Sequence, residues 1–224
     1  MTTQIQTTGH PLVQSFNNVH TALRTDLKAL DSAIQRRGDL GKPELERANR
    51  WFEFYWQQLA AHHNGEDTYF YPAIAKYDKN FTPEIEKLTG QHHQMDHLAE
   101  ELKATYSRAA MSRDVQEYRD LARRYGNLIS TLNTTMNDHL AHEEGILFPS
   151  IANNMPVDDQ VAIDSAYIKK VPMKELSWLA PWLLTNMSTE QAQEMRGKVP
   201  WVIRFLYDNF WIKKYKTLVA TFRF

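Results

Sequence analysis

The sequence predicts an all-α protein, an up-down-up-down antiparallel four-helix bundle followed by a helical C-terminal extension. Apolar residues recur every three or four positions over long segments, which is the pattern of amphipathic helices. The eight glycines and nine prolines fall mostly between these segments, so the connections are short. The chain also repeats itself: a shift of 77 residues places His62 on His139 and Glu66 on Glu143. Short connections between long helices favour an antiparallel bundle.

Four long helices are expected in order. The first covers residues 11–37 and ends at the stretch between Gly38 and Gly41. The second runs from about residue 43 to the region of residue 76, with a bend at Asn64 and Gly65. The third begins after Thr82, with a proline in its first turn where proline is tolerated, and reaches about residue 111. The fourth spans roughly residues 113–153, and the predicted bundle domain is 1–154.

The tail, residues 155–224, forms the predicted Trp-rich helical extension. Ser188 followed by Gln191 resembles a capping box, and Gly197 with Pro200 marks a break. Its basic, aromatic end is compatible with a membrane-surface or partner-binding element. We favour packing on the outside of the bundle, because aromatic residues at helical spacing most often fill cores.

Composition excludes several classes of function. The net charge of −1 gives no general attraction to nucleic acid or anionic membranes, so neither is an expected partner. The absence of cysteine excludes disulfides, cysteine zinc fingers and cysteine-ligated iron–sulfur clusters. The N-terminus lacks the pattern of a secretion signal, and no stretch is long and apolar enough for a transmembrane segment. A cytoplasmic location is expected.

The repeated histidines and glutamates predict a metal site. Residues four apart on a helix share a face, so His-x-x-x-Glu can offer two ligands to one ion. Adjacent histidines cannot share a face, so one each of His62/His63 and His92/His93 should be a bystander. Five histidines with two carboxylates suit a transition metal such as iron, with zinc as an alternative. The spacing selects His20, His62, Glu66, His93, His97, His139 and Glu143.

Two other metal proteins fit the sequence less well. A ferritin-like di-iron site uses Glu-x-x-His, but no histidine here follows a glutamate by three residues. A zincin would require His-Glu-x-x-His, which is also missing. A structural zinc bundle is the remaining alternative.

The order of these ligands resembles the hemerythrin-like, or HHE cation-binding, family over about residues 10–154. That family's pattern is a lone His, His-x-x-x-Glu, His-x-x-x-His, and a His followed four or five residues later by a carboxylate. In addition, the tail phrase LSWLAPWLL is similar to the C-terminal extension of actinobacterial hemerythrin-like proteins.

The resemblance implies two iron ions joined by an oxo or hydroxo bridge. It assigns one iron to His93, His97 and His139 and the other to His20 and His62. Glu66 and a carboxylate of the fourth helix would bridge them. Oxygen-carrying hemerythrins have that carboxylate five residues after the histidine, which corresponds to Glu144 here. The internal repeat instead aligns Glu143 with Glu66, and we choose Glu143.

Counting ligands on two such six-coordinate irons leaves one open position. The repeat places Phe16 where the other iron has His93, so we expect the opening beside Phe16, in an apolar pocket for a small ligand. Tyr55, two helical turns before His62, is a candidate hydrogen-bond donor to that ligand, or an ordinary core tyrosine.

The function expected from this resemblance is binding of a small oxidant or gas such as O2, H2O2 or NO. A di-iron oxidoreductase acting on peroxide (peroxidase- or catalase-like) or on nitric oxide is favoured over carriage. The alternative is an oxygen or iron sensor, or a storage module, that signals through its C-terminal tail. The sequence does not specify a protein partner or an oligomeric state.

Overall fold

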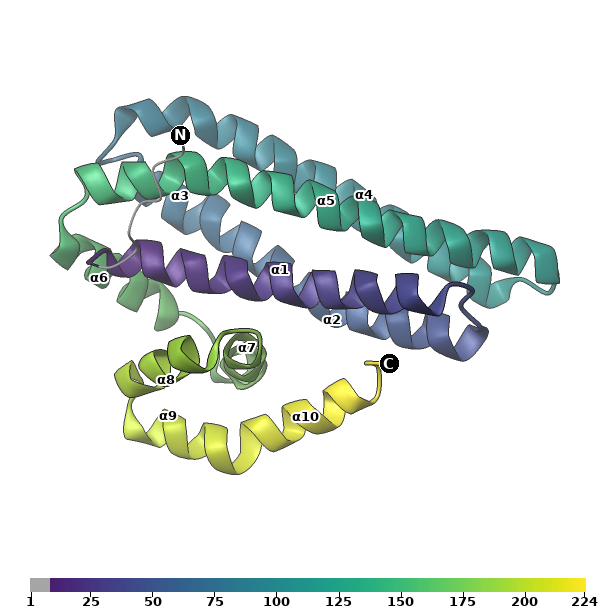
Figure 1. Cartoon of the computed structure of the whole chain (residues 1–224). Helices are drawn as coiled ribbons and strands as arrows, with labels where there is room; N and C mark the ends of the chain where they lie inside the picture. Colours follow the sequence, from purple (N-terminus) through teal and green to yellow (C-terminus); the bar gives the residue numbers. More distant parts are fainter. Residues whose placement is uncertain (1–8) are drawn as a thin grey trace.

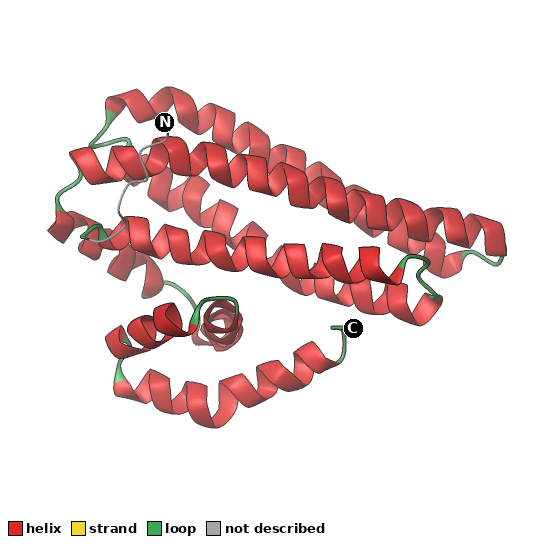
Figure 2. Cartoon of the chain, in the orientation of Figure 1, coloured by secondary structure: helices red, strands yellow, loops and turns green. Residues whose placement is uncertain are grey.

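A computed structural model describes residues 9–224, and every regular element in this part of the chain is helical (Figures 1 and 2). The four long helices contact one another to form the bundle, with the most extensive contacts between α4 and α5 and between α1 and α5. Their bounds are α1 Pro11–Arg37, α2 Lys42–Gly65, α4 Thr82–Met111 and α5 Val115–Asn154.

Local capping explains where these helices begin and end, and the predicted ranges agree within about two residues. Gly38 closes α1 with a φ of +72°, a left-handed value that favours glycine. Asp114 caps α5, because its side chain accepts a hydrogen bond from the backbone N–H of Glu117 at 2.8 Å. The fourth helix therefore starts at Val115.

The predicted second helix is divided into three pieces. After α2 the chain forms a π-helical turn, η1 (Glu66–Phe70), and then the short helix α3 (Tyr71–Ile74). A 3-10 turn, η2 (Lys79–Phe81), leads into α4. A π turn inserts one extra residue into the helix and rotates everything beyond it, and such turns frequently mark functional sites. Here the turn begins at Glu66, one of the predicted ligands.

Two apolar cores fill the bundle, and a polar layer lies between them. The larger core includes Leu59, Met95 and Leu140, all fully buried. The smaller core includes Phe16 and Leu147 and lies at the end of the bundle where α3 sits. In each helix the candidate ligands lie, along the sequence, between residues of the larger core and residues of the smaller core. Together they form a buried polar layer across the bundle.

The C-terminal extension consists of short helices that contact the bundle through α1 and α2 (Figure 1). Ser188 and Gln191 form the predicted capping box. Among the described residues, none of the helices combines the length and the apolar character that crossing a bilayer requires. The elements are α6 Val157–Ile168, α7 Met173–Thr185, α8 Thr189–Lys198, α9 Trp201–Leu206, the π turn η3 Tyr207–Trp211 and α10 Ile212–Ala220.

Asp26 of α1 anchors this extension. Its carboxylate is 1% exposed and accepts hydrogen bonds from the indole N–H of Trp182 at 2.8 Å and from that of Trp51 at 2.9 Å. Arg223, near the C-terminus, donates to the same carboxylate at 2.8 Å. A buried charge is tolerated when it is paired and hydrogen-bonded in this way. These bonds connect α7 and the chain's end to α1 and α2.

Candidate metal centre

Seven buried or nearly buried side chains from the four long helices and the π turn form two overlapping groups. In each group the nitrogen and oxygen atoms that face one another lie within 4.8 Å. Such spacing allows one ion to be reached by all members of a group. The first group is His63, Glu66, His92 and His139, and the second is His20, His62, Glu66 and Glu143.

Glu66 belongs to both groups because its two carboxylate oxygens face different histidines. Oε1 lies 2.9 Å from Nε2 of His62 and 3.9 Å from Nε2 of His20. Oε2 lies 3.5 Å from Nε2 of His92. The arrangement is that of a carboxylate able to bridge two ions.

Glu143 is the second carboxylate in the layer, and it is completely buried. Its Oε2 lies 3.3 Å from Nε2 of His20 and 3.9 Å from Nε2 of His139. Its Oε1 accepts a hydrogen bond from the Tyr71 hydroxyl at 2.9 Å. Glu144 points elsewhere, toward Nδ1 of His20 and toward Arg24. The geometry therefore places the carboxylate four residues after His139, not the one five after it, among the facing atoms.

Three of the imidazoles are held from behind through Nδ1. His20 contacts Glu144 at 2.9 Å, His92 contacts Asp67 at 3.0 Å, and His139 contacts Gln91 at 2.9 Å. Because these oxygens accept hydrogen bonds, each Nδ1 carries a proton, and in the neutral form of each ring Nε2 presents its lone pair to the layer. Oxygen acceptors behind metal-ligating histidines commonly fix the tautomer and the ring orientation in this way. Nε2 of His92 and Nε2 of His139 lie 3.2 Å apart, facing the same space.

The layer contains polar atoms that nothing else in the described chain satisfies. These atoms are buried and lack a hydrogen-bond partner, and an unpaired buried polar atom costs roughly 1–3 kcal/mol. A metal ion would supply the missing partner, so the residues present fit a metal. The atoms are Nε2 of His20, His62 and His63, both carboxylate oxygens of Glu66, and Oε2 of Glu143.

Burial and neighbouring charges shift the pKa values of the side chains in the layer away from their ordinary values. Burial lowers the pKa of His139 to about 3, with help from His92, and burial also lowers the pKa of His62. His20 differs, because Glu143, Glu144 and Glu66 outweigh the effect of its burial and raise its pKa to about 9. The metal-free layer therefore holds neutral imidazoles at His62 and His139 and a protonated His20 beside the carboxylates.

Burial and neighbouring charges shift the pKa values of the two buried carboxyl groups in opposite directions. Burial alone would raise the pKa of Glu66, but His62 and His20 lower it well below its usual range. Burial and the charge of Glu66 raise the pKa of Glu143 well above its usual range. A carboxyl that keeps its proton beside a charged one relieves repulsion until a cation enters.

The raised pKa of His20 predicts pH-dependent metal binding. Below about pH 9 the metal-free protein carries a proton on His20 that the metal must displace. The apparent affinity for ferrous iron should then rise about tenfold per pH unit between roughly pH 6 and pH 8 for each displaced proton. Anaerobic calorimetry in buffers of different protonation enthalpy measures the released protons. A pH-independent affinity would contradict this assignment.

The structure does not bring the predicted ligands His93 and His97 into the layer, because both side chains point away from it. They are 70% and 83% exposed and lie near Asp96 and Glu100 on the outer face of α4. Spacing of four guarantees that two residues share a helix face, but it does not say which face is buried. The 77-residue shift also aligns His20 with His97, but the structure places His20 in the layer and His97 at the surface.

His92 and His63 lie in the layer, although the spacing had selected their neighbours His93 and His62 and left these two as bystanders. His92 is 2% exposed and lies on the apolar stripe of α4 with Leu88 and Met95, which was a readable signal. His63 is 5% exposed and stacks on His92 with ring centroids 3.9 Å apart. His62 and His63 both lie in the layer, because His62 belongs to the group of His20 and His63 to the group of His92. Glu66 is shared by the two groups.

Helix α6 packs against the π turn that carries Glu66. A Cβ at Gly65 would collide with the hydroxyl of Tyr167, so only glycine fits there. The Tyr167 ring also packs on Phe70 with centroids 4.6 Å apart. The first helix of the extension thus rests directly on the segment that positions Glu66.

Of the two residues proposed to shape the ligand pocket, the structure places Phe16 beside the layer. Its ring contacts His20 and His62 edge-on, with centroid distances of 5.9 and 6.3 Å. Tyr55 is fully buried in the larger core, and its hydroxyl has no hydrogen-bond partner among the described residues. The phenol on a candidate ligand is that of Tyr71, which sequence reasoning missed.

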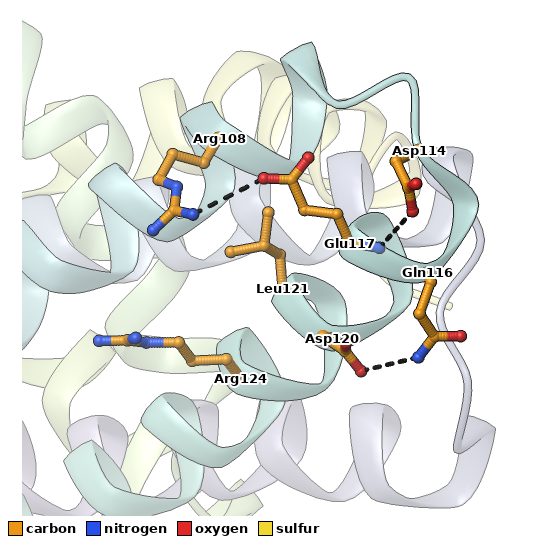
Figure 3. A pocket seen from close by; sticks show the side chains of 7 residues that line it. All are labelled: Arg108, Asp114, Gln116, Glu117, Asp120, Leu121 and Arg124. Atoms are coloured by element: carbon orange, nitrogen blue, oxygen red, sulfur yellow. Dashed lines mark hydrogen bonds and ion pairs between the residues drawn. The ribbon is translucent and has the colours of Figure 1, made fainter.

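The open surface hollow drawn in Figure 3 belongs to a different part of the bundle. It lies at the turn between α4 and α5, about 30 Å from His139 along the axis of α5. Its contacts, such as the ion pair of Arg108 with Glu117, are those of helix ends. The buried layer, which has the unsatisfied atoms, remains the candidate site.

Comparison with known proteins identifies the bundle. Residues 12–157 match the family described as the hemerythrin HHE cation binding domain. The protein named zinc finger protein BRUTUS, from Arabidopsis thaliana, is 26% identical over 179 residues, which is 79% of this chain. The chain spans 14% of that relative's length, so the activity of the whole relative is not transferred. No solved structure matches significantly.

Proposed function

Because the chain belongs to the hemerythrin HHE cation-binding family, a family of metal-binding helical domains, we propose that its buried layer holds two iron ions and binds a small oxidant or gas. O2, H2O2 and NO are the ligand class. Bound iron would supply redox chemistry and a coordination position for such a ligand. We also propose that the four long helices follow an up-down-up-down topology, which the short connections between them support.

The observation that carries this proposal is the division of ligands around Glu66. Three imidazoles, those of His63, His92 and His139, face one side of its carboxylate, and two, those of His20 and His62, face the other. Two ions bridged by Glu66 would satisfy every unpaired atom in the layer. A single structural zinc would leave about half of these atoms unsatisfied, because four ligands complete its shell.

The smaller number of imidazoles around His20 and His62 supports an open position on that side of Glu66. Phe16 occupies that side, and its ring packs on Phe70 with centroids 5.1 Å apart. The Phe148 ring is stacked on the His20 ring, with centroids 6.1 Å apart. Aromatic side chains packed this closely around the position favour a small ligand such as a diatomic molecule or peroxide.

Replacing Phe16 by histidine tests the location of that opening. The new imidazole would lie beside His20 and His62 and complete the second set to three, so we expect iron content near wild type and loss of the spectral change caused by azide. Phe16→Leu is the matched control, because it keeps the position apolar and should keep the azide response. An azide response retained by iron-loaded Phe16→His would place the opening elsewhere.

Turnover would distinguish an enzyme from a carrier. Iron-loaded protein should consume hydrogen peroxide or nitric oxide catalytically if it is the expected oxidoreductase, and His62→Ala should abolish that activity with its iron. Stoichiometric, reversible binding without turnover would instead indicate carriage or storage.

A sensor is the second candidate function, favoured by the contact of α6 with the π turn. Tyr167 packs against Gly65 and Phe70, immediately around Glu66, so metal occupancy can influence how the extension sits. Limited proteolysis of the full chain with and without iron tests this. Iron-dependent protection of residues 155–224 supports a sensor, and identical cleavage of both forms opposes it.

A further inference from the structure

The last helical stretch of the chain, α9 through η3 to α10, has apolar residues on two opposite sides. One side packs inward, where Tyr207, Trp211 and Tyr215 are 9%, 9% and 2% exposed. On the other side Trp201 is 73% exposed and Phe205 is 52% exposed. A surface helix normally has a single apolar stripe, facing its core. The outward stripe therefore needs an explanation other than folding of this chain.

The π turn at residues 207–211 extends this outward stripe. Phe205 and Phe210 are five residues apart, which on an α-helix would separate them by about 140°. The wider turn brings their rings together, with centroids 6.3 Å apart, while Tyr207 and Trp211 stay on the inner side. Phe210 is 58% exposed and Val202 is 44% exposed. We call this group the outer face: Trp201, Val202, Phe205 and Phe210.

The charge around the outer face differs from that of the rest of the chain. Residues 196–224 contain seven of the 26 basic residues and one of the 27 acidic residues, which gives a net charge of +6 against −7 for the remainder. The single acid, Asp208, is paired with Arg196 at 2.8 Å. Arg204, Lys213 and Lys216 are exposed. Arg223 is paired with Asp26, so the exposed Arg204, Lys213 and Lys216 carry the basic charge that can meet an anionic surface.

We infer that the outer face binds the surface of an anionic lipid bilayer. Exposed Trp and Phe side chains with Lys and Arg beside them are the composition of helices that lie in a membrane interface. A second copy of the chain fits less well, because two segments of charge +6 would repel each other. Nucleic acid also fits less well, because Val202 offers no flat surface for a base to stack on.

The position of the outer face is compatible with a bilayer. α7 contacts both α1 and the stretch η3–α10, so it lies between this stretch and the bundle (Figure 1). α9 and η3 therefore lie on the outside of the molecule, away from the histidine layer. The inference is independent of the proposed iron chemistry, since none of the residues involved lies near the candidate ligands.

Cosedimentation of the full chain with vesicles tests the inference. We expect at least tenfold stronger partition onto phosphatidylcholine vesicles containing about one third phosphatidylglycerol than onto phosphatidylcholine alone. Trp201→Ala/Phe205→Ala/Phe210→Ala should reduce partition about tenfold, and Arg204→Glu/Lys213→Glu/Lys216→Glu should remove the preference for the anionic lipid. Met111→Ala/Val115→Ala, at residues 77% and 66% exposed on the bundle, is the matched control and should behave as wild type.

Several results would overturn the inference. Absence of partition, equal partition onto both vesicles, or wild-type partition by the triple aromatic variant would each do so. Light scattering that shows a dimer lost in the aromatic variant, without vesicle binding, would assign the face to a second copy. Binding of a single-stranded oligonucleotide but not vesicles would assign it to nucleic acid. Because the substituted side chains are exposed, circular dichroism should confirm that each variant is folded.

Discussion

Glu66→Gln is expected to abolish stable iron loading. Glu66 is the one residue shared by both ligand groups, with one oxygen facing His62 and the other facing His92. Loss of a partner behind a ligand typically costs about 10–100-fold in metal affinity, so loss of a carboxylate that contacts both ions should cost more. Glutamine keeps the size of the side chain, so a failure to fold is not the expected cause. Iron per chain after desalting is the measurement.

The control for this prediction is Glu100→Gln. Glu100 lies on α4 with its side chain 76% exposed, so the same chemical change there should leave iron content unchanged. A fully loaded Glu66→Gln protein would remove Glu66 from the bridging position. Glu66→Ala should lose iron as well, whereas a Glu66→Gln protein that retains a single ion would indicate that only one of the two groups depends on this carboxylate.

The second large effect separates two neighbouring histidines. His92→Ala should lose most of the bound iron, because His92 is 2% exposed and its Nε2 faces Glu66 and His139. His93→Ala should keep it, because that side chain is 70% exposed on the opposite side of α4. The two variants differ by one position and make the same chemical change, so each is the other's control. Metal analysis and circular dichroism of both proteins provide the readout.

The contrast is expected to repeat with His63 and His97. His63 stacks on His92 within the layer, whereas His97 lies beside Glu100 at the surface. Iron lost in His93→Ala and His97→Ala, but kept in His63→Ala and His92→Ala, would mean that α4 presents its other face in the loaded protein. That result would restore the ligand set predicted from spacing.

Helix positions could be predicted from the sequence because their causes are local. The proline at the start of α1, the glycine that closes it and the aspartate that caps α5 act on their immediate neighbours. The π turn at Glu66 could not be predicted in this way. The hydroxyl of Tyr167 in α6 lies against Gly65, which is about a hundred residues earlier in the chain, and spacing along the sequence does not show this contact.

The structure brings together only part of the predicted ligand set, for a physical reason. His20, His62, Glu66, His139 and Glu143 come together in the layer, and the repeat aligns four of them, His62 with His139 and Glu66 with Glu143. The repeat cannot specify how α4 is rotated, since spacing of four occurs equally on every face of a helix. The apolar residues of α4, Leu88 and Met95 among them, specify that rotation and place His92 inward.

The expectation that only one of two adjacent histidines lies in the site does not hold for His62 and His63, which the structure brings into the two groups of the layer. It holds for a single ion reached from one helix face. Here the side chains flank Glu66 on both sides, so His62 faces His20 while His63 faces His92. A site with two metal positions can use neighbouring residues that a site with one position cannot.

The most direct test of the central claim is the metal content of the wild-type chain expressed with iron, recorded together with its optical spectrum before and after azide. The proposed centre predicts about two irons per chain and an absorption spectrum that changes when azide is added. One zinc per chain, or no metal, would contradict the di-iron assignment and with it the proposed chemistry of small oxidants and gases.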